Sequence, residues 1–182
     1  MPVLQAKSYV IGTGPVAAMA IGGGVAAAAG GVTKFADPEV ASFVRIFTTA
    51  PEQQRNKAVL RCDPLLMNAA KARAEDMANR RYFNHTDLDG YGPNHYARQA
   101  GYNLPYGTAA DKSGNQIESI SAGAMTGERT WQSWMDSPKH KIHLTGADAF
   151  FREQVDYGIW RANVPGSPYT FYWVFLSSRP VR

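Results

Sequence analysis

The segment that most constrains the fold is residues 169–176, which have the sequence Tyr-Thr-Phe-Tyr-Trp-Val-Phe-Leu. Successive side chains of a strand point to opposite faces, and this run is apolar on both. Such a strand fits the middle of a sheet that is covered on both sides. Residues 155–162 form a second aromatic and β-branched run, and residues 164–168, with two prolines and a glycine, predict a hairpin loop between the two. We therefore expect a short antiparallel sheet with helices on both of its faces.

Several positions carry the residues that begin helices. A side-chain oxygen followed by proline is typical of a helix start, because the oxygen caps free N–H groups and proline fits the first turn. This pair occurs at Asp37-Pro38, Asp63-Pro64 and Ser137-Pro138. The predicted helices cover residues 37–49, 63–82, 92–101, 126–135 and a short stretch from 137, with a loop over 102–116. The expected fold class is α+β, an α-β-α sandwich with a Gly/Ala-rich N-terminal arm.

That arm covers residues 1–36, which hold seven glycines, nine alanines and no acidic residue. Three interpretations compete. A lysine followed by small residues suits a secretory signal, with Ala18-Met19-Ala20 as a cleavage site. The length suits a membrane span, but the Gly22-Gly23-Gly24 run and the low hydrophobicity of Ala and Gly do not. The third interpretation is an ordered arm that packs against a neighbouring subunit, because glycine loses much entropy on ordering and needs such cover.

Length and composition exclude several classes of protein. A chain of 182 residues is typical of one domain, or of one domain with an arm, and we assign the domain to residues 37–182. The single cysteine, Cys62, excludes an intramolecular disulfide and a multi-cysteine zinc site. Residues 37–182 hold 17 Lys/Arg against 15 Asp/Glu and no dense basic run. We therefore expect no nucleic-acid partner.

Three residues are candidates for chemistry. His85 follows the long predicted helix in a polar loop, His140 lies at the start of the last short helix, and Glu118 lies between isoleucines in Ile117-Glu118-Ser119-Ile120. A single histidine is more often a simple hydrogen-bonding residue than a functional one. Two imidazoles and a carboxylate together are the set that binds zinc with an open position or carries out acid–base chemistry.

The order of motifs along the chain resembles the bacterial branch of the CAP superfamily (cysteine-rich secretory proteins, antigen 5 and pathogenesis-related proteins), also called SCP domains. The resemblance covers residues 52–178. Its most specific element is Trp134-Met135-Asp136-Ser137-Pro138-Lys139-His140, and the second is His85-Thr86-Asp87-Leu88-Asp89-Gly90. An Ile-Glu-Ser-Ile segment lies between them, and Gly-Ile-Trp and Phe-Tyr-Trp-Val strands follow.

The resemblance implies an α-β-α sandwich with a cleft lined by histidines and acidic residues, where related domains hold a divalent metal, often zinc. It assigns His85 and His140 to the two cleft histidines and Glu118 to the glutamate of the family's Glu-Asn-Ile element. This chain departs from the family at Ser119, which replaces asparagine, and at Ile117, which replaces glycine. A third zinc ligand would have to come from His143, Glu128 or an unidentified residue.

The function that we expect is a non-catalytic binding or structural module. It would lie outside the cytoplasm or in a virus particle, not within a membrane, and residues 1–36 would attach it to copies of itself or to a larger assembly. The first alternative is a zinc-dependent hydrolase of peptides or cell-wall material, with zinc on His85 and His140 and with Glu118 as the base. The second is a secreted lipid-binding protein. A peptide or a lipid is the expected ligand of the cleft.

Overall fold

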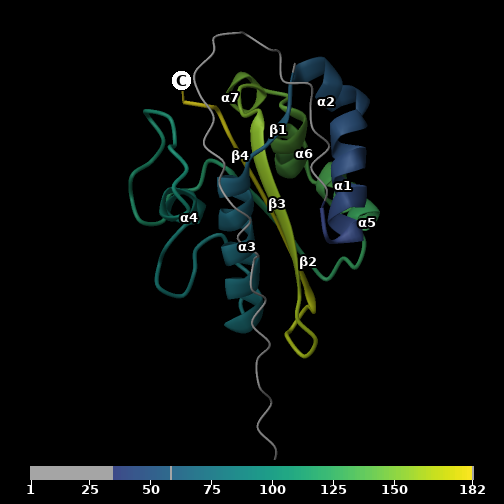
Figure 1. The fold of residues 1–182 in the computed structure, drawn as a ribbon, viewed down its shortest axis with the longest axis vertical. Helices are drawn as coiled ribbons and strands as arrows, with labels where there is room; N and C mark the ends of the chain where they lie inside the picture. Colours follow the sequence, from purple (N-terminus) through teal and green to yellow (C-terminus); the bar gives the residue numbers. More distant parts are fainter. Residues whose placement is uncertain (1–34, 58, 182) are drawn as a thin grey trace, which may run out of the picture. The chain divides into compact units, whose positions relative to one another are not determined.

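The computed structural model describes residues 35–57 and 59–181, and the chain divides into two units, Met1–Val32 and Thr33–Arg182. The expectations for the arm therefore fall almost wholly outside the described residues. The second unit is a mixed α/β domain, which confirms the α+β prediction (Figure 1). Among the described residues, no helix has the length and apolar character needed to cross a membrane.

The sheet has four strands in the order β1-β3-β4-β2. They are β1 (Arg61–Cys62), β2 (Glu118–Ala122), β3 (Asp156–Asn163) and β4 (Phe171–Ser178). β4 pairs antiparallel with β3, as the hairpin predicts, and it also pairs antiparallel with β2, a strand that was not predicted. β1 pairs parallel with β3, so the sheet is mixed. A strand of two residues is too short to show alternation in the sequence. The salt bridge from Arg61 Nε to Asp156 Oδ1, at 2.7 Å, joins β1 to β3 across this parallel edge.

Strand β4 divides the hydrophobic core into two layers. Tyr172, Val174 and Leu176 are buried on one face, and Trp173 and Phe175 on the other. The first layer is covered by α3 (Pro64–Asn79) together with α4 (Pro93–Gln99). The second is covered by α1 (Pro38–Thr49) and α5 (Gly127–Asp136). Figure 1 shows α3 and α1 on opposite sides of the sheet, which confirms the α-β-α sandwich.

The helix starts follow the predicted caps. Side-chain oxygens of Asp37, Asp63 and Thr126 accept hydrogen bonds from the first turns of α1, α3 and α5. Ser137 precedes α6 (Pro138–Thr145) but its side chain makes no capping bond. Helix α3 ends at Asn79 rather than near Tyr82, because Arg81 adopts a left-handed backbone with φ of +61°.

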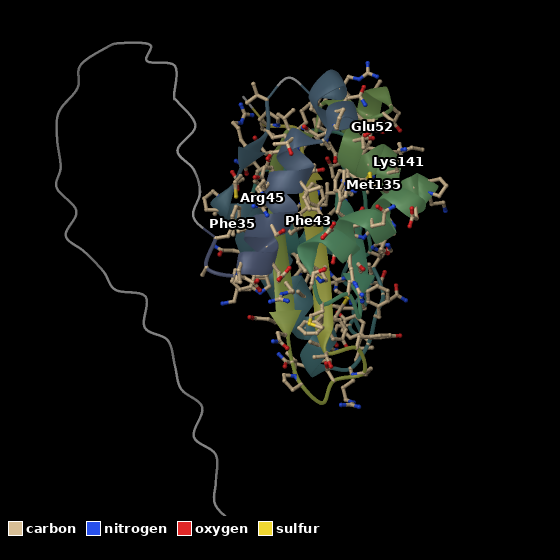
Figure 2. All side chains as sticks on the ribbon, turned by 90° about the vertical axis from the view of Figure 1, so that its right-hand side faces the viewer. Phe35, Phe43, Arg45, Glu52, Met135 and Lys141 are labelled. Carbon is tan, nitrogen blue, oxygen red and sulfur yellow. The ribbon has the colours of Figure 1, made fainter. Side chains whose placement is uncertain are left out.

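Two short helices were not predicted, α2 (Pro51–Asn56) and α7 (Ala149–Arg152). Each is too short to develop a 3.6-residue hydrophobic pattern. Helix α2 lies against α6, and Figure 2 shows Glu52 and Lys141 on the same face of the domain, where they form an ion pair of 3.8 Å. In the same view Phe43 points from α1 into the second core layer. Its ring is perpendicular to the Trp134 ring, and the two ring centroids lie 5.3 Å apart.

Candidate functional site

The candidate site is built around Glu118, the first residue of β2. Its side chain has no exposed surface and forms a buried salt bridge with Arg73 of α3, with Nε to Oε1 at 2.9 Å and Nη2 to Oε2 at 3.4 Å. The Arg73 side chain is also wholly buried. The sequence holds one signal for this residue: Arg73 falls among the apolar positions of α3 that face the core. An arginine there indicates a buried partner, because arginine is almost never fully buried unless it is paired.

Arg73 also fixes the loop that carries His85. Its Nη2 donates to the backbone carbonyls of Asn84 at 2.8 Å and of His85 at 3.0 Å, and its Nη1 donates to the hydroxyl of Tyr82. One guanidinium thus joins a helix, a strand and the histidine loop. Guanidinium groups suit this task because they present five donors in a rigid plane.

His85 contacts Glu118 directly. Its Nδ1 lies 2.8 Å from Oε2 of the carboxylate, and the imidazole is 42% exposed. Since an ionised carboxylate only accepts hydrogen bonds, Nδ1 carries a proton. In the neutral ring Nε2 is then the free acceptor, as in carboxylate–histidine pairs that orient a ligand or a base.

His140, on α6, lies in the same pocket as His85. The pocket has a volume of about 390 Å³, and both histidines and Glu118 line it, so the structure brings the three predicted site residues together. Burial lowers the pKa of His140 below its ordinary value, and the neighbouring imidazole of His85 lowers it further. His140 is therefore a neutral imidazole at pH 7. The pocket lining also includes Asn115, Gln116, Lys139, Ile142, His143, Asp148 and Phe151.

His143 takes a structural position rather than a ligating one. It is 3% exposed, and its Nδ1 and Nε2 lie 2.7 Å and 2.8 Å from the hydroxyls of Ser119 and Ser177. Ser177 donates in turn to Gln154, so Nε2 of His143 donates to Ser177 and Nδ1 accepts from Ser119. Burial and the charge of Lys57 hold the pKa of His143 well below its ordinary value.

A zinc site with three protein ligands does not fit this donor set. The described part of the chain contains no group of three or more His, Cys, Asp or Glu side chains that could hold a metal ion. Both ring nitrogens of His143 are used by serines, and Glu128 is exposed on α5 and does not line the pocket. Both oxygens of Glu118 accept hydrogen bonds from Arg73 or His85. His85 and His140 remain as two imidazole donors, fewer than the three that catalytic zinc usually has.

The sequence pattern of the cysteine-rich secretory protein family, CAP, matches residues 44–157. The chain belongs to the CAP family. The match includes His85, Glu118 and His140, and it ends at the start of β3, so the two long strands complete the CAP domain beyond it. No curated protein matches the chain.

Two solved structures share the CAP fold of this chain. An outer surface protein from Borrelia burgdorferi is 22% identical, with a TM-score of 0.55, over 78% of this chain and 92% of that one. An extracellular protein containing an SCP domain from Bacillus anthracis is 17% identical, with a TM-score of 0.58, over 78% of this chain and 41% of that one. At these identities the similarity concerns the fold.

Proposed function

We propose that this CAP domain is a non-catalytic binding module and that the pocket around His85 and His140 holds its ligand. The observation that carries the proposal is the enclosure of Glu118. A general base must reach the proton that it removes, directly or through one water. The Glu118 side chain has no exposed surface, and its oxygens are bonded to Arg73 and His85, so it orients the histidine and does not meet a water in the pocket.

The chemistry of the pocket favours a short peptide over a lipid. His85 and His140 offer imidazole nitrogens, Asn115 and Gln116 offer amides, and Lys139 and Asp148 place one charge of each sign on the lining. The lining also includes the apolar Ile142 and Phe151. A peptide has donors, acceptors and apolar groups that match this mixture, whereas an acyl chain would leave the polar groups without partners.

We further propose that the module works outside the cytoplasm. Support comes from the names of the two structural relatives, one an outer surface protein and the other an extracellular protein. Residues 1–36 would attach the domain to copies of itself or to a larger assembly such as a virus particle or a cell surface. Light scattering of the full chain and of a chain without residues 1–34 gives the number of chains in each particle and so tests this attachment. The same number of chains per particle for both proteins would contradict it.

The competing function is the zinc-dependent hydrolase. It is supported by the pairing of Glu118 with His85, which leaves Nε2 available in the pocket. It requires a third zinc ligand and a base other than the enclosed carboxylate.

One experiment separates the two functions. The full chain is incubated with a peptide library and with cell-wall fragments, with and without Zn²⁺, and both binding and cleavage are recorded by mass spectrometry. We expect peptide retention that His85→Ala and His140→Ala abolish, and no cleavage. His95→Ala is the matched control, because His95 lies on α4 and does not line the pocket. Cleavage that requires zinc and is lost in His140→Ala would overturn the proposal in favour of the hydrolase.

A further inference from the structure

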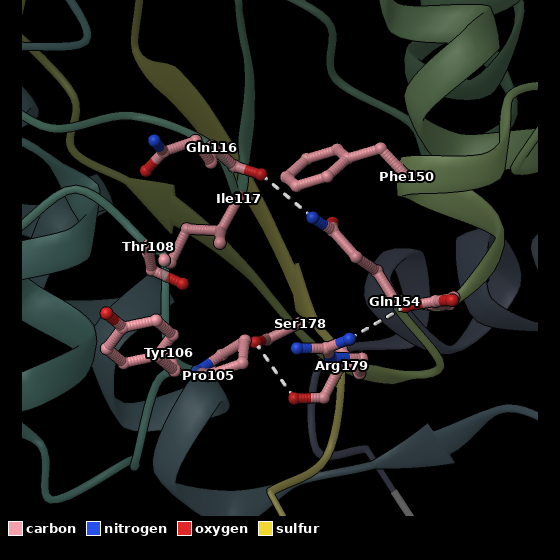
Figure 3. Close-up of a pocket in the computed structure, with 11 residues that line it drawn as sticks. Pro105, Tyr106, Thr108, Gln116, Ile117, Phe150, Gln154, Ser178 and Arg179 are labelled. Carbon is pink, nitrogen blue, oxygen red and sulfur yellow. Dashed lines mark hydrogen bonds and ion pairs between the residues drawn. The ribbon is translucent and has the colours of Figure 1, made fainter.

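A second pocket lies beside the first and has no role in the function proposed above. Its volume is about 250 Å³, and it lies between the loop at residues 105–108 and α7 (Figure 3). Gln116 lines both pockets and forms the wall between them.

Two aromatic rings lie on opposite sides of this second pocket. Tyr106 is fully exposed at 104% and Phe150 is 55% exposed, while Ile117, on the lining between them, is buried at 2% (Figure 3). Aromatic side chains supply much of the binding energy where they meet a ligand, because they bury a large area at a low entropic cost. Two exposed rings around one cavity therefore indicate a ligand with a flat apolar face that can stack on them.

The charges around the pocket cancel. Among its lining residues only Glu153 and Arg179 are charged, and they form an ion pair of 3.1 Å between Oε2 and Nη1. The lining thus has no net charge for an ionic ligand to pair with. The guanidinium uses one of its five donors in this pair, and Oε1 of Glu153 accepts no bond from the described residues, so both groups retain hydrogen-bonding capacity toward a ligand.

Two backbone carbonyls of the lining are already used within the protein. The carbonyl of Gln116 accepts from Nε2 of Gln154 at 2.9 Å, and the carbonyl of Ile117 accepts from the backbone of Ser177 at 2.9 Å. These two carbonyls are therefore not open to an extended peptide, which binds through main-chain groups.

We propose that this pocket binds one neutral sugar ring. A pyranose has apolar C–H surfaces, which Tyr106 and Phe150 would cover from opposite sides, and a rim of hydroxyls, which Arg179 and Glu153 would bond. An acyl chain would use none of the remaining donors and acceptors of Arg179 and Glu153, and an anionic ligand would meet the Glu153 carboxylate beside the guanidinium. The volume of about 250 Å³ lies just below the ~300–1,000 Å³ of sites for drug-sized ligands, which suits a single ring.

The test is an NMR titration of the full chain with methyl glycosides of glucose, galactose, mannose and N-acetylglucosamine. We expect at least one glycoside to shift the backbone amides of Gly107, Thr108 and Gln154, with an affinity that does not depend on salt. Phe150→Ala and Tyr106→Ala should each weaken binding about tenfold. Tyr169→Ala is the matched control, because Tyr169 is an exposed aromatic that does not line this pocket.

Two outcomes would overturn the proposal: no shift with any glycoside, or equal shifts in Phe150→Ala, Tyr106→Ala and the wild type. Stronger binding of glucuronate or of octanol than of the glycosides would also overturn it, in favour of an anionic or an apolar ligand. Trisaccharides of the best glycoside show whether the ring comes from a free sugar or from a glycan chain, since a chain binds more tightly than its single ring. His85→Ala leaves this pocket unchanged, so the sugar test and the peptide test fail independently.

Discussion

At the scale of single residues, the central feature is the buried Arg73–Glu118 pair. The two residues are 45 positions apart in the sequence, and together they place His85 in the pocket. The sequence identified Glu118 and both cleft histidines through their motifs, but it did not indicate that Arg73 meets Glu118, because that contact depends on how α3 packs on the sheet. The orientation of His143 was open for the same reason, since its partners Ser119 and Ser177 lie on two different strands.

We expect Arg73→Met to destabilise the domain by about 3–5 kcal/mol, because it leaves the Glu118 carboxylate buried without its cation. Urea unfolding measures the loss. Arg73→Met combined with Glu118→Met should recover much of it, since a buried ion pair replaced by apolar residues is often neutral in stability. Arg73→Lys should keep the charge but shift the His85 ring signals in NMR, because lysine lacks the planar donors that bind both carbonyls. A loss below about 1 kcal/mol in Arg73→Met would contradict the assigned role.

At the scale of elements, the helix starts depend on local sequence signals, whereas the short strands and helices depend on long-range packing. The caps at Asp37, Asp63 and Thr126 depend only on neighbouring residues, so the sequence located them. Strand β4 was located from its two apolar faces. Strands β1 and β2 and helices α2 and α7 were missed, because each is short and forms through contacts with distant elements.

The packing of α3 against β3 gives a prediction at the scale of elements. A Cβ at Gly158 would lie 2.2 Å from the backbone carbon of Leu66 and 2.3 Å from the nitrogen of Met67, so the helix rests directly on the strand. We expect Gly158→Ala to cost about 3 kcal/mol of stability, because two backbones must move apart.

Gly166→Ala is the control for that substitution. Gly166 has φ of +86° and open space around its Cβ position, so alanine there should cost only about 1 kcal/mol, through backbone strain. Thermal or urea unfolding of both variants measures the difference. Equal losses would show that α3 adjusts freely over β3 and that the close approach is not required.

At the scale of the whole molecule, His143 belongs both to the layered core and to the polar site. Its ring centroid lies 5.5 Å from that of Phe175 in the second core layer, while its two nitrogens form hydrogen bonds with serines of β2 and β4. His143 therefore lines the pocket and at the same time joins α6 to the sheet through hydrogen bonds. Lys57 also contacts this histidine: its Nζ donates to the backbone carbonyls of His143 and Gln154, and burial lowers the pKa of Lys57 to about 8.

This arrangement makes the stability of the domain depend on pH. His143 stays neutral in the folded state, whereas in the unfolded chain it takes up a proton near its ordinary pKa of about 6.5. Below that pH the unfolded state binds more protons than the folded state, so stability falls as the pH falls, by up to about 1.4 kcal/mol per pH unit for this group. Urea unfolding at pH 7.5, 6.5 and 5.5 measures the slope, and His143→Gln should make it shallower even though the variant is less stable throughout. His95→Gln, which changes a histidine outside this hydrogen-bonded chain, should leave more of the slope in place. If His143→Gln has the same slope as the wild type, acid sensitivity arises elsewhere and His143 does not join α6 to the sheet as a neutral ring.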